Sequence, residues 1–281
     1  EEHVKHAISF QLSAISNLAP PKADSRSPKA TKMNPLYHYL LKLADDTLIF
    51  GQRLGELCGK GPYLEEDIAL TNIALDYLGQ SNNLFKYAAQ VQNENKTEDD
   101  LAFLRLEKEY LNCQLSELPN GDYAQTILKV YFFSVYQKLL YEVLMKSSDS
   151  TLAGIAEKSL KEVKYHYTHA STWVKMFAGG TEESKTRLQN AVHHLWEYTG
   201  GIFAETPGEK DLVKLDIVPD SKKLHEDWKA EVSKDFQNFG IEIPESEFMQ
   251  KGSRTGYHTE YFGYILCELQ YMQRTYPDCV W

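Results

Sequence analysis

Apolar residues recur every three or four positions through almost all of the chain after Met33, which is the period of an amphipathic α-helix. The first stripe consists of Leu36, Leu40, Leu43, Thr47, Phe50, Leu54 and Leu57. Asn34-Pro35 is a typical helix start, and the Gly-Lys-Gly-Pro run at 59–62 is a typical helix end. No segment of the sequence alternates between apolar and polar residues as a β-strand does. The pattern therefore predicts an all-α protein.

The same period predicts the other helices of the chain. We expect them over about 65–90, 100–113, 123–146, 151–178, 181–203, 221–236 and 256–276. Residues 123–146 are apolar on nearly every face, so this helix should be central. Residues 204–220 contain Pro207, Gly208 and Pro219 and should form a long connection. The sequence thus predicts a bundle of four core helices with several peripheral helices.

The first 32 residues differ in composition from the rest of the chain. Residues 20–32 are rich in proline, serine and lysine and almost free of apolar side chains, which is typical of a flexible linker. We predict a flexible or fused N-terminal segment over residues 1–32, with a short amphipathic stretch around 4–18. A disordered tail is the alternative. The helical domain is expected over residues 33–281.

Charge and cysteine content exclude several classes of protein. The net charge is −10 and the pI about 5.4, whereas a nucleic-acid-binding protein needs a basic face. No apolar run approaches the ~20 residues of a membrane span, and there is no signal-peptide pattern. The four cysteines are scattered and include no C-x-x-C pair. We therefore expect reduced, mostly buried thiols in a cytoplasmic protein.

Two predicted helices carry a carboxylate where a di-iron bundle would carry Glu-x-x-His. A di-iron carboxylate site takes a glutamate from each of two helices and a Glu-x-x-His pair from each of two others. Here Asp76 is followed three positions later by Gly79, and Glu162 by Tyr165. Both pairs therefore lack the histidine that would hold the metal. His166 lies four positions after Glu162, one place too late.

The residues themselves leave two interpretations open. Glu162 and His166 at i, i+4 are able to bind one metal from a single helix face, and His166 with His169 is another possible chelate. The facing helices offer few side chains that would complete a metal site. The positive charge of Lys138 is better suited to an ion pair with a carboxylate than to a site for a cation. We expect Lys138 near Asp76 or Glu162, where its charge would replace the metal. The preferred interpretation is a degenerate metal site with a structural charge network, no metal ligands and no catalytic residues.

Several blocks of sequence resemble the structural, C-type subunit of bacterial phenylacetyl-CoA epoxidases. The run from Glu65 to Gln80, EEDIALTNIALDYLGQ, is similar to the second core helix of that family. The other matching blocks are QRLGE at 52–56, KEVKYH at 161–166, HTE at 258–260, ELQYMQR at 268–274, Tyr276-Pro277 and Trp281. The resemblance spans about residues 33–281 and does not cover 1–32.

The resemblance implies a ferritin-like helical fold and a place in a multicomponent oxygenase. In this family a homologous catalytic subunit holds the di-iron centre, and a small accessory subunit and a reductase complete the complex. The complex converts the phenylacetyl-CoA ring to its 1,2-epoxide with molecular oxygen during aerobic phenylacetate degradation. The resemblance implies that the C-type chain binds no cofactor and scaffolds its partner. The alternatives are an active di-iron oxygenase using Asp76, Glu162 and His166, and a free-standing helical binding module.

Overall fold

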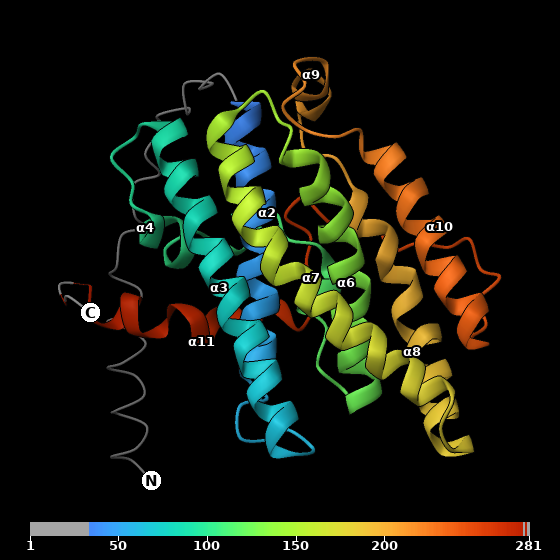
Figure 1. Cartoon of the computed structure of the whole chain (residues 1–281). Helices are drawn as coiled ribbons and strands as arrows, with labels where there is room; N and C mark the ends of the chain where they lie inside the picture. The colour runs from blue at the N-terminus through green and yellow to red at the C-terminus, as the bar shows by residue number, and fades with distance from the viewer. Residues whose placement is uncertain (1–33, 278, 280–281) are drawn as a thin grey trace, which may run out of the picture. The chain divides into compact units, whose positions relative to one another are not determined.

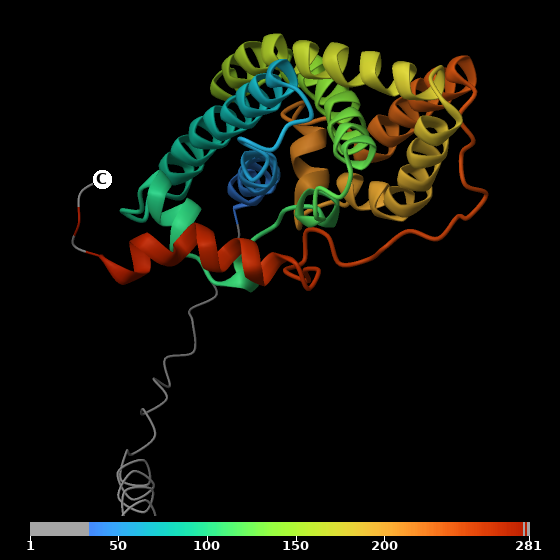
Figure 2. The same cartoon turned by 90° about the horizontal axis from the view of Figure 1, so that it is seen from below.

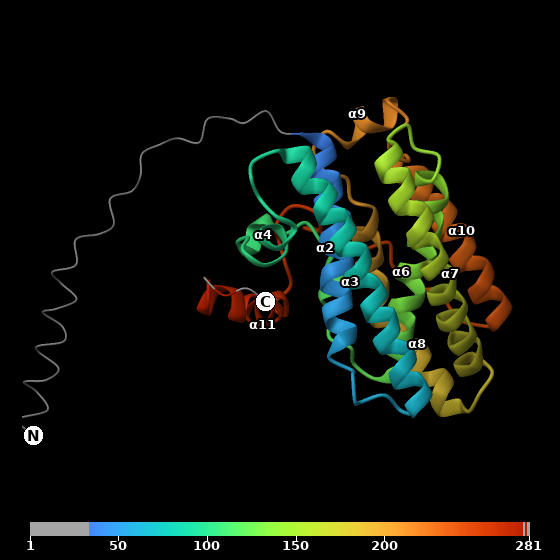
Figure 3. The ribbon, with the colours of Figure 1, turned by 60° about the vertical axis from the view of Figure 1, so that its left-hand side comes forward.

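Four long helices form the core of the computed structural model, which describes residues 34–277 and 279. Helix α2 (Pro35–Gly55) packs against α3 (Leu64–Gln92), and α6 (Tyr123–Leu144) packs against α7 (Ser150–Ala178). The four helices run side by side in Figure 1, and Figure 3 shows the two pairs next to each other. All regular structure in the described residues is helical, which confirms the predicted all-α class.

The segment predicted over residues 1–32 lies outside the described residues. Met33, the expected start of the helical domain, and the terminal Trp281 lie outside them as well. The division at residue 32 therefore stays a prediction.

Side-chain caps determine where three of the core helices begin. Asn34, Asp122 and Asp149 precede α2, α6 and α7, and each accepts a hydrogen bond of 2.9–3.1 Å from a backbone amide two or three positions further on. Such caps satisfy amides that have no partner within the helix. Pro35 at the first position of α2 needs no amide partner. The helix start predicted at Asn34-Pro35 is therefore confirmed.

Helix α6 is buried on almost every side, as its sequence predicts. Aromatic rings from three core helices meet beside it. The Phe50 ring lies 5.0 Å from that of Phe133 and 5.3 Å from that of Tyr77, at angles typical of favourable aromatic pairs. Burial of these rings and of the aliphatic residues around them supplies the main stabilisation of the bundle.

A second group of helices covers the other side of α6. It comprises α8 (Glu182–Thr199), the 3₁₀ turn η2 (Gly200–Phe203) and α10 (Ser221–Phe239). In Figure 3, α10 lies on the opposite side of α6 from the α2–α3 pair. The indole nitrogen of Trp228 on α10 donates to the carbonyl of Phe132 at 3.0 Å. The connection expected over 204–220 includes the short helix α9 (Glu209–Lys214).

A continuous helix was expected over about 100–113, but only its first turn, up to Phe103, is helical as expected, so this expectation is wrong for the rest. The structure has α4 (Glu98–Phe103), the 3₁₀ turn η1 (Glu107–Glu109) and α5 (Gln114–Glu117). Arg105 pairs with the buried Asp45 of α2, and the backbone amide of Leu111 donates to the same carboxylate at 2.8 Å. Because that amide has a partner outside the segment, the segment winds around Asp45 instead of continuing as a helix.

The last helix, α11 (Phe262–Thr275), begins later than expected. Residues Gly252, Arg254 and Gly256 adopt positive φ angles of 116°, 70° and 74°, which a helix excludes. His258, which falls within the helix expected over 256–276, therefore precedes α11. Figure 2 shows the chain running from the end of α10 along the outside of the bundle to α11.

The cysteines are only partly as expected. All four are unpaired, which confirms that they form no disulfide framework. Cys113 is buried, but Cys58, Cys267 and Cys279 are exposed, so the expectation of mostly buried thiols is wrong. In the described part of the chain, no helix combines the length and the hydropathy needed to cross a membrane.

Candidate functional site

A network of polar side chains lies among the apolar side chains between the core helices. Gln80 of α3 and Gln137 of α6 are almost fully buried. The amide nitrogen of Gln80 donates to Glu162 Oε2 of α7 at 3.0 Å. Its Oε1 accepts from the hydroxyl of Tyr141 at 3.3 Å and from the amide of Gln137 at 3.4 Å. The Glu162 carboxylate therefore accepts from one amide, and that amide links it to a second amide and a phenol in a single hydrogen-bonded network.

A second bond joins the same two helices one turn away. His166 of α7 is fully buried, and its Nε2 lies 2.9 Å from Asp76 Oδ2 of α3. Its ring packs against that of Tyr77 with centroids 4.9 Å apart. The side chain of Asp76 is 34% exposed, so it lies at the rim of the bundle instead of its centre. His166 Nδ1 is buried and has no hydrogen-bond partner among the described residues.

Together the two contacts form a reciprocal seam between α3 and α7. Asp76 and Gln80 are four residues apart on one helix, and Glu162 and His166 are four apart on the other. Residues at i, i+4 lie on the same helix face. Each carboxylate bonds to the neutral or basic partner of the opposite helix: Asp76 to His166 and Glu162 to Gln80. We call these four residues the α3–α7 seam.

The seam corrects the expected register of the candidate metal site. Gly79 and Tyr165, at the i+3 positions of the two pairs, are exposed. A histidine at either position would point away from the bundle centre. The inward positions are the i+4 residues, Gln80 and His166. The histidine was therefore expected at the wrong position, because i+3 to each carboxylate faces outward and i+4 faces inward. Of the four residues expected at the site, Asp76, Glu162 and His166 do lie together.

Lys138 is the expected residue that lies elsewhere. Its ammonium pairs with Glu231 on α10 and lies 4.2 Å from the centre of the Tyr167 ring. Within the described residues, no ion pair joins Lys138 to Asp76 or Glu162. The expectation that this lysine replaces the metal is wrong, because Lys138 faces the α7–α10 side of its helix.

His169, the other histidine considered from sequence, belongs to a separate cluster. Its Nε2 lies 2.8 Å from Glu66 Oε2, which also accepts from the hydroxyl of Tyr123 at 2.5 Å. Burial raises the pKa of Glu66, but the hydrogen bonds from Tyr123 and His169 outweigh it, and the pKa lies below its ordinary value. This cluster fastens α3, α6 and α7 beside the seam: Glu66 lies ten residues before Asp76 on α3, and His169 lies three residues after His166 on α7.

Most of the buried charge lies along α2, which sequence reasoning did not single out. Lys42 pairs with Glu209 of α9 at 2.9 Å, Asp45 pairs with Arg105, and Asp46 pairs with Arg254 at 2.5 Å. All six side chains are at most 7% exposed. Each pair fastens α2 to a different peripheral segment of the chain. We call these three contacts the α2 ion pairs.

A buried carboxylate on α5 extends this group. Glu117 Oε1 lies 2.5 Å from His258 Nδ1, and its Oε2 accepts from the backbone amide and hydroxyl of Thr259 at 2.7 Å. The His258 ring stacks on that of Phe262, the first residue of α11, at 4.0 Å. Glu117 thus holds the residues that lead into α11.

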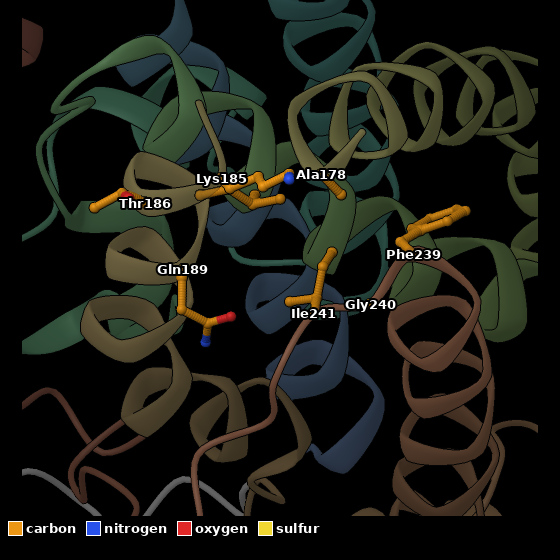
Figure 4. Close-up of a pocket in the computed structure, with 8 residues that line it drawn as sticks. Ala178, Lys185, Thr186, Gln189, Phe239, Gly240 and Ile241 are labelled. Carbon is orange, nitrogen blue, oxygen red and sulfur yellow. The ribbon is translucent and has the colours of Figure 1, made fainter. Parts of the chain in front are cut away.

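The pockets of the described residues are open to the surface, and the charged side chains that line two of them form ion pairs: Arg187 with Glu183 and Asp122, and Lys210 with Glu205. One of about 450 Å³ opens between the end of α7, α8 and the end of α10. Figure 4 shows Lys185 and Gln189 on one side of it and Phe239 and Ile241 on the other. The only charged residue lining it is Lys185, which pairs with Glu182. This donor set favours no catalytic reaction.

The central donors do not fit a di-iron carboxylate site. Such a site needs four carboxylates and two histidines. The α3–α7 seam supplies two carboxylates and one histidine, and each of them is already hydrogen-bonded. In the described residues, no group of three or more histidine, cysteine, aspartate or glutamate side chains is placed to hold a metal ion.

Comparison with known proteins gives a consistent result. Residues 21–281 match the model of the family described as phenylacetic acid catabolic protein. The chain is 39% identical over 249 residues to the C subunit of the 1,2-phenylacetyl-CoA epoxidase of Escherichia coli (strain K12). The match covers 89% of this chain and all of the E. coli protein.

Proposed function

This chain belongs to the phenylacetic acid catabolic protein family, which is ferritin-like, and we propose that it is the non-catalytic C-type subunit of a phenylacetyl-CoA 1,2-epoxidase. In this role it scaffolds a homologous di-iron subunit that performs the ring epoxidation. The family and the ferritin-like fold class inferred from sequence are confirmed. The scaffold role is the further step, and it rests on the chemistry of the bundle centre.

The α3–α7 seam is the observation that carries this proposal. A metal centre needs carboxylates and imidazoles whose lone pairs are directed at a common point. Here the lone pairs of Glu162 and Asp76 accept hydrogen bonds from Gln80 and His166 instead. Gln137 and Tyr141 complete the network without adding a charge. The centre is therefore stable without a metal, and its side chains serve packing between helices.

The proposal places the redox chemistry in the partner. The di-iron centre of the catalytic subunit supplies oxygen activation, and a small accessory subunit and a reductase complete the assembly. Within this assembly the present chain holds its partner through its helical surface. The absence of paired cysteines also supports a cytoplasmic location.

An active oxygenase using Asp76, Glu162 and His166 is the weaker alternative. Asp76 lies at the rim, and the imidazole nitrogen that faces it is already hydrogen-bonded to it. Glu162 lies at the other contact of the seam, bonded to an amide. A metal at this place would have to replace both contacts and then find further ligands on α2 and α6.

Co-expression with the catalytic subunit of the same organism tests the proposal. We expect the two chains to co-purify, and we expect epoxidation of phenylacetyl-CoA to require both. The uncharged variants Glu162→Gln and His166→Gln should leave the iron content and the turnover of the complex unchanged. Separate elution of the two wild-type chains would overturn the proposed function. So would loss of iron and turnover in these variants while the complex stays intact.

A further inference from the structure

The outer face of α3 carries a row of exposed aliphatic side chains. Leu64, Ile68, Leu75 and Leu78 are spaced four, seven and three residues apart, so they share one face of the helix. They are 70, 52, 59 and 37% exposed. Single exposed apolar residues are common, but four along one helix face are a typical feature of an interaction surface. We call these four residues the α3 stripe.

The same face has no exposed charge over four turns. Between residues 68 and 82 of α3, the exposed residues are Ile68, Asn72, Leu75, Leu78, Gly79 and Asn82. Asp76, the acid within this range, is half-buried and paired with His166. One residue in four of the whole chain is charged. Depletion of charge is a feature of the cores of protein interfaces.

Gly79 has no role within this chain that explains it. It lies in the middle of α3 and is exposed, and a Cβ added to it would meet no atom within 4 Å. Glycine destabilises a helix relative to alanine, so a glycine at an open position loses stability without relieving a clash. Glycine also allows another backbone to approach closely, and this use fits its place beside the exposed Leu75 and Leu78.

The area of the surface is that of a stable interface. Tyr63, 64% exposed, extends the α3 stripe at the start of the helix. At roughly 200 Å² for a large side chain, Tyr63 and the stripe expose on the order of 500 Å². A standard interface takes ~800 Å² from each partner, of which somewhat more than half is apolar. The stripe therefore supplies the apolar share of one interface.

We propose that the α3 stripe docks an apolar helix face of the catalytic subunit, whose backbone passes close over Gly79. This inference rests on the proposed function, which supplies the partner. A second copy of this chain would bring two net charges of −10 together, and their repulsion disfavours a homodimer through this surface. Similarity to one lettered subunit of an epoxidase indicates a different subunit as the partner.

Two pairs of matched variants test the docking surface in the full-length chain. Leu75→Glu and Leu215→Glu make the same change at side chains that are 59 and 61% exposed, but Leu215 follows α9, outside the α3 stripe. Gly79→Ala and Gly154→Ala each fill an exposed helical glycine with open space, and Gly154 lies on α7. All four variants should keep the thermal stability of the wild type or exceed it.

The readout is the dissociation constant for the catalytic subunit of the same organism, with sedimentation of the isolated chain alongside. We expect Leu75→Glu to weaken binding by about 30-fold or more and Gly79→Ala by about fivefold, as at the centre of an interface. Leu215→Glu and Gly154→Ala should bind as the wild type does.

Wild-type affinity in both α3 variants would overturn the docking surface and leave the proposed function standing. An isolated dimer that Leu75→Glu dissociates would overturn it too, because the occupant would be a second copy. Failure of the wild-type chains to associate would overturn the proposed function itself.

Discussion

The centre of the bundle and the flank of α2 handle polar groups in opposite ways. At the centre, Gln80 donates to Glu162 and in turn accepts from the neutral side chains of Gln137 and Tyr141. Along α2, three fully charged pairs are buried between helix and periphery, among them Asp46 with Arg254. A metal-holding bundle concentrates its acids at the centre. In the described residues the fully buried acids lie outside the central network: Asp45 and Asp46 on α2, Glu117 on α5 and Glu209 on α9.

The contrast separates two uses of buried charge. A buried ion pair stabilises a protein little more than well-packed apolar groups would, but removing one partner of the pair destabilises the protein strongly. The α2 ion pairs therefore specify where α4, α9 and the segment before α11 attach. The centre needs no such specification, because the four core helices are already held by their apolar faces. Neutral hydrogen bonds are sufficient there.

Breaking an α2 ion pair should have the largest effect. Arg254→Met leaves the buried carboxylate of Asp46 without its partner, and it also removes the hydrogen bonds to the carbonyls of Leu111 and Ile202. We expect a loss of about 3–5 kcal/mol in the free energy of unfolding, measured by urea denaturation. The double variant Arg254→Met, Asp46→Asn should recover part of this loss. A cost below ~1 kcal/mol for the single change would contradict the role given to this pair.

Returning charge to the centre should have the next largest effect. Gln80→Glu puts a second carboxylate within hydrogen-bond distance of Glu162, and like charges this close raise the pKa of one of them. The folded variant then keeps a proton that the unfolded chain releases, so its free energy of unfolding falls as pH rises above ~4.3. We expect a loss of about 2 kcal/mol at pH 8 relative to pH 5. Gln80→Leu, which adds no charge, should show no such pH dependence.

The buried Lys129 gives a pH dependence of the opposite sign. Its ammonium donates to the carbonyls of Leu118 and Pro119, and burial, with a smaller contribution from the charge of Arg53, lowers its pKa from 10.5 to about 7. Between these values the unfolded chain binds a proton that the folded chain lacks, so the free energy of unfolding rises with pH. The slope contributed by this lysine is at most ~1.4 kcal/mol per pH unit. Denaturation between pH 7 and 9 should show this slope in the wild type relative to Lys129→Met, and equal slopes would refute the assignment.

An exposed ion pair should matter least. Arg187 contacts Glu183 at 2.6 Å and Asp122 at 3.7 Å, but its side chain is 56% exposed. Water and salt screen such contacts, so Arg187→Ala should cost less than ~1 kcal/mol, and the cost should shrink in high salt. A loss comparable to that of Arg254→Met would show that burial does not decide the strength of these pairs.

The sequence predicted the helices well where their stability is local. Periodicity gave α2, α3, α6 and α7 to within a few residues, and Asn34-Pro35 gave the start of α2. The errors fall where a buried polar contact comes from a distant part of the chain. Asp45 is 60 residues from Arg105 and Glu117 is 141 residues from His258, and these contacts end one expected helix and delay another. No local pattern reports such partners.

The candidate site was predicted in part for a related reason. Residues three and four positions after Asp76 both lie on its side of the helix, so spacing alone did not decide whether Gly79 or Gln80 faces inward. The exposed Leu75 and Leu78 flank Asp76 and make the outer face of α3 as apolar as a core face. Gln80 and His166, both at i+4 to a carboxylate, were the available signal for the α3–α7 seam. The partner of Lys138, Glu231, lies on a helix whose position the sequence did not give.

Iron analysis of this chain alone and in complex with the catalytic subunit tests the central claim most directly. We expect the chain purified alone to hold no stoichiometric iron, and the complex to hold only the di-iron centre of the partner. Glu162→Gln and His166→Gln in this chain should leave the iron content of the complex unchanged. Stoichiometric iron in the isolated chain that disappears in these variants would contradict the account, because the α3–α7 seam would then be a metal site.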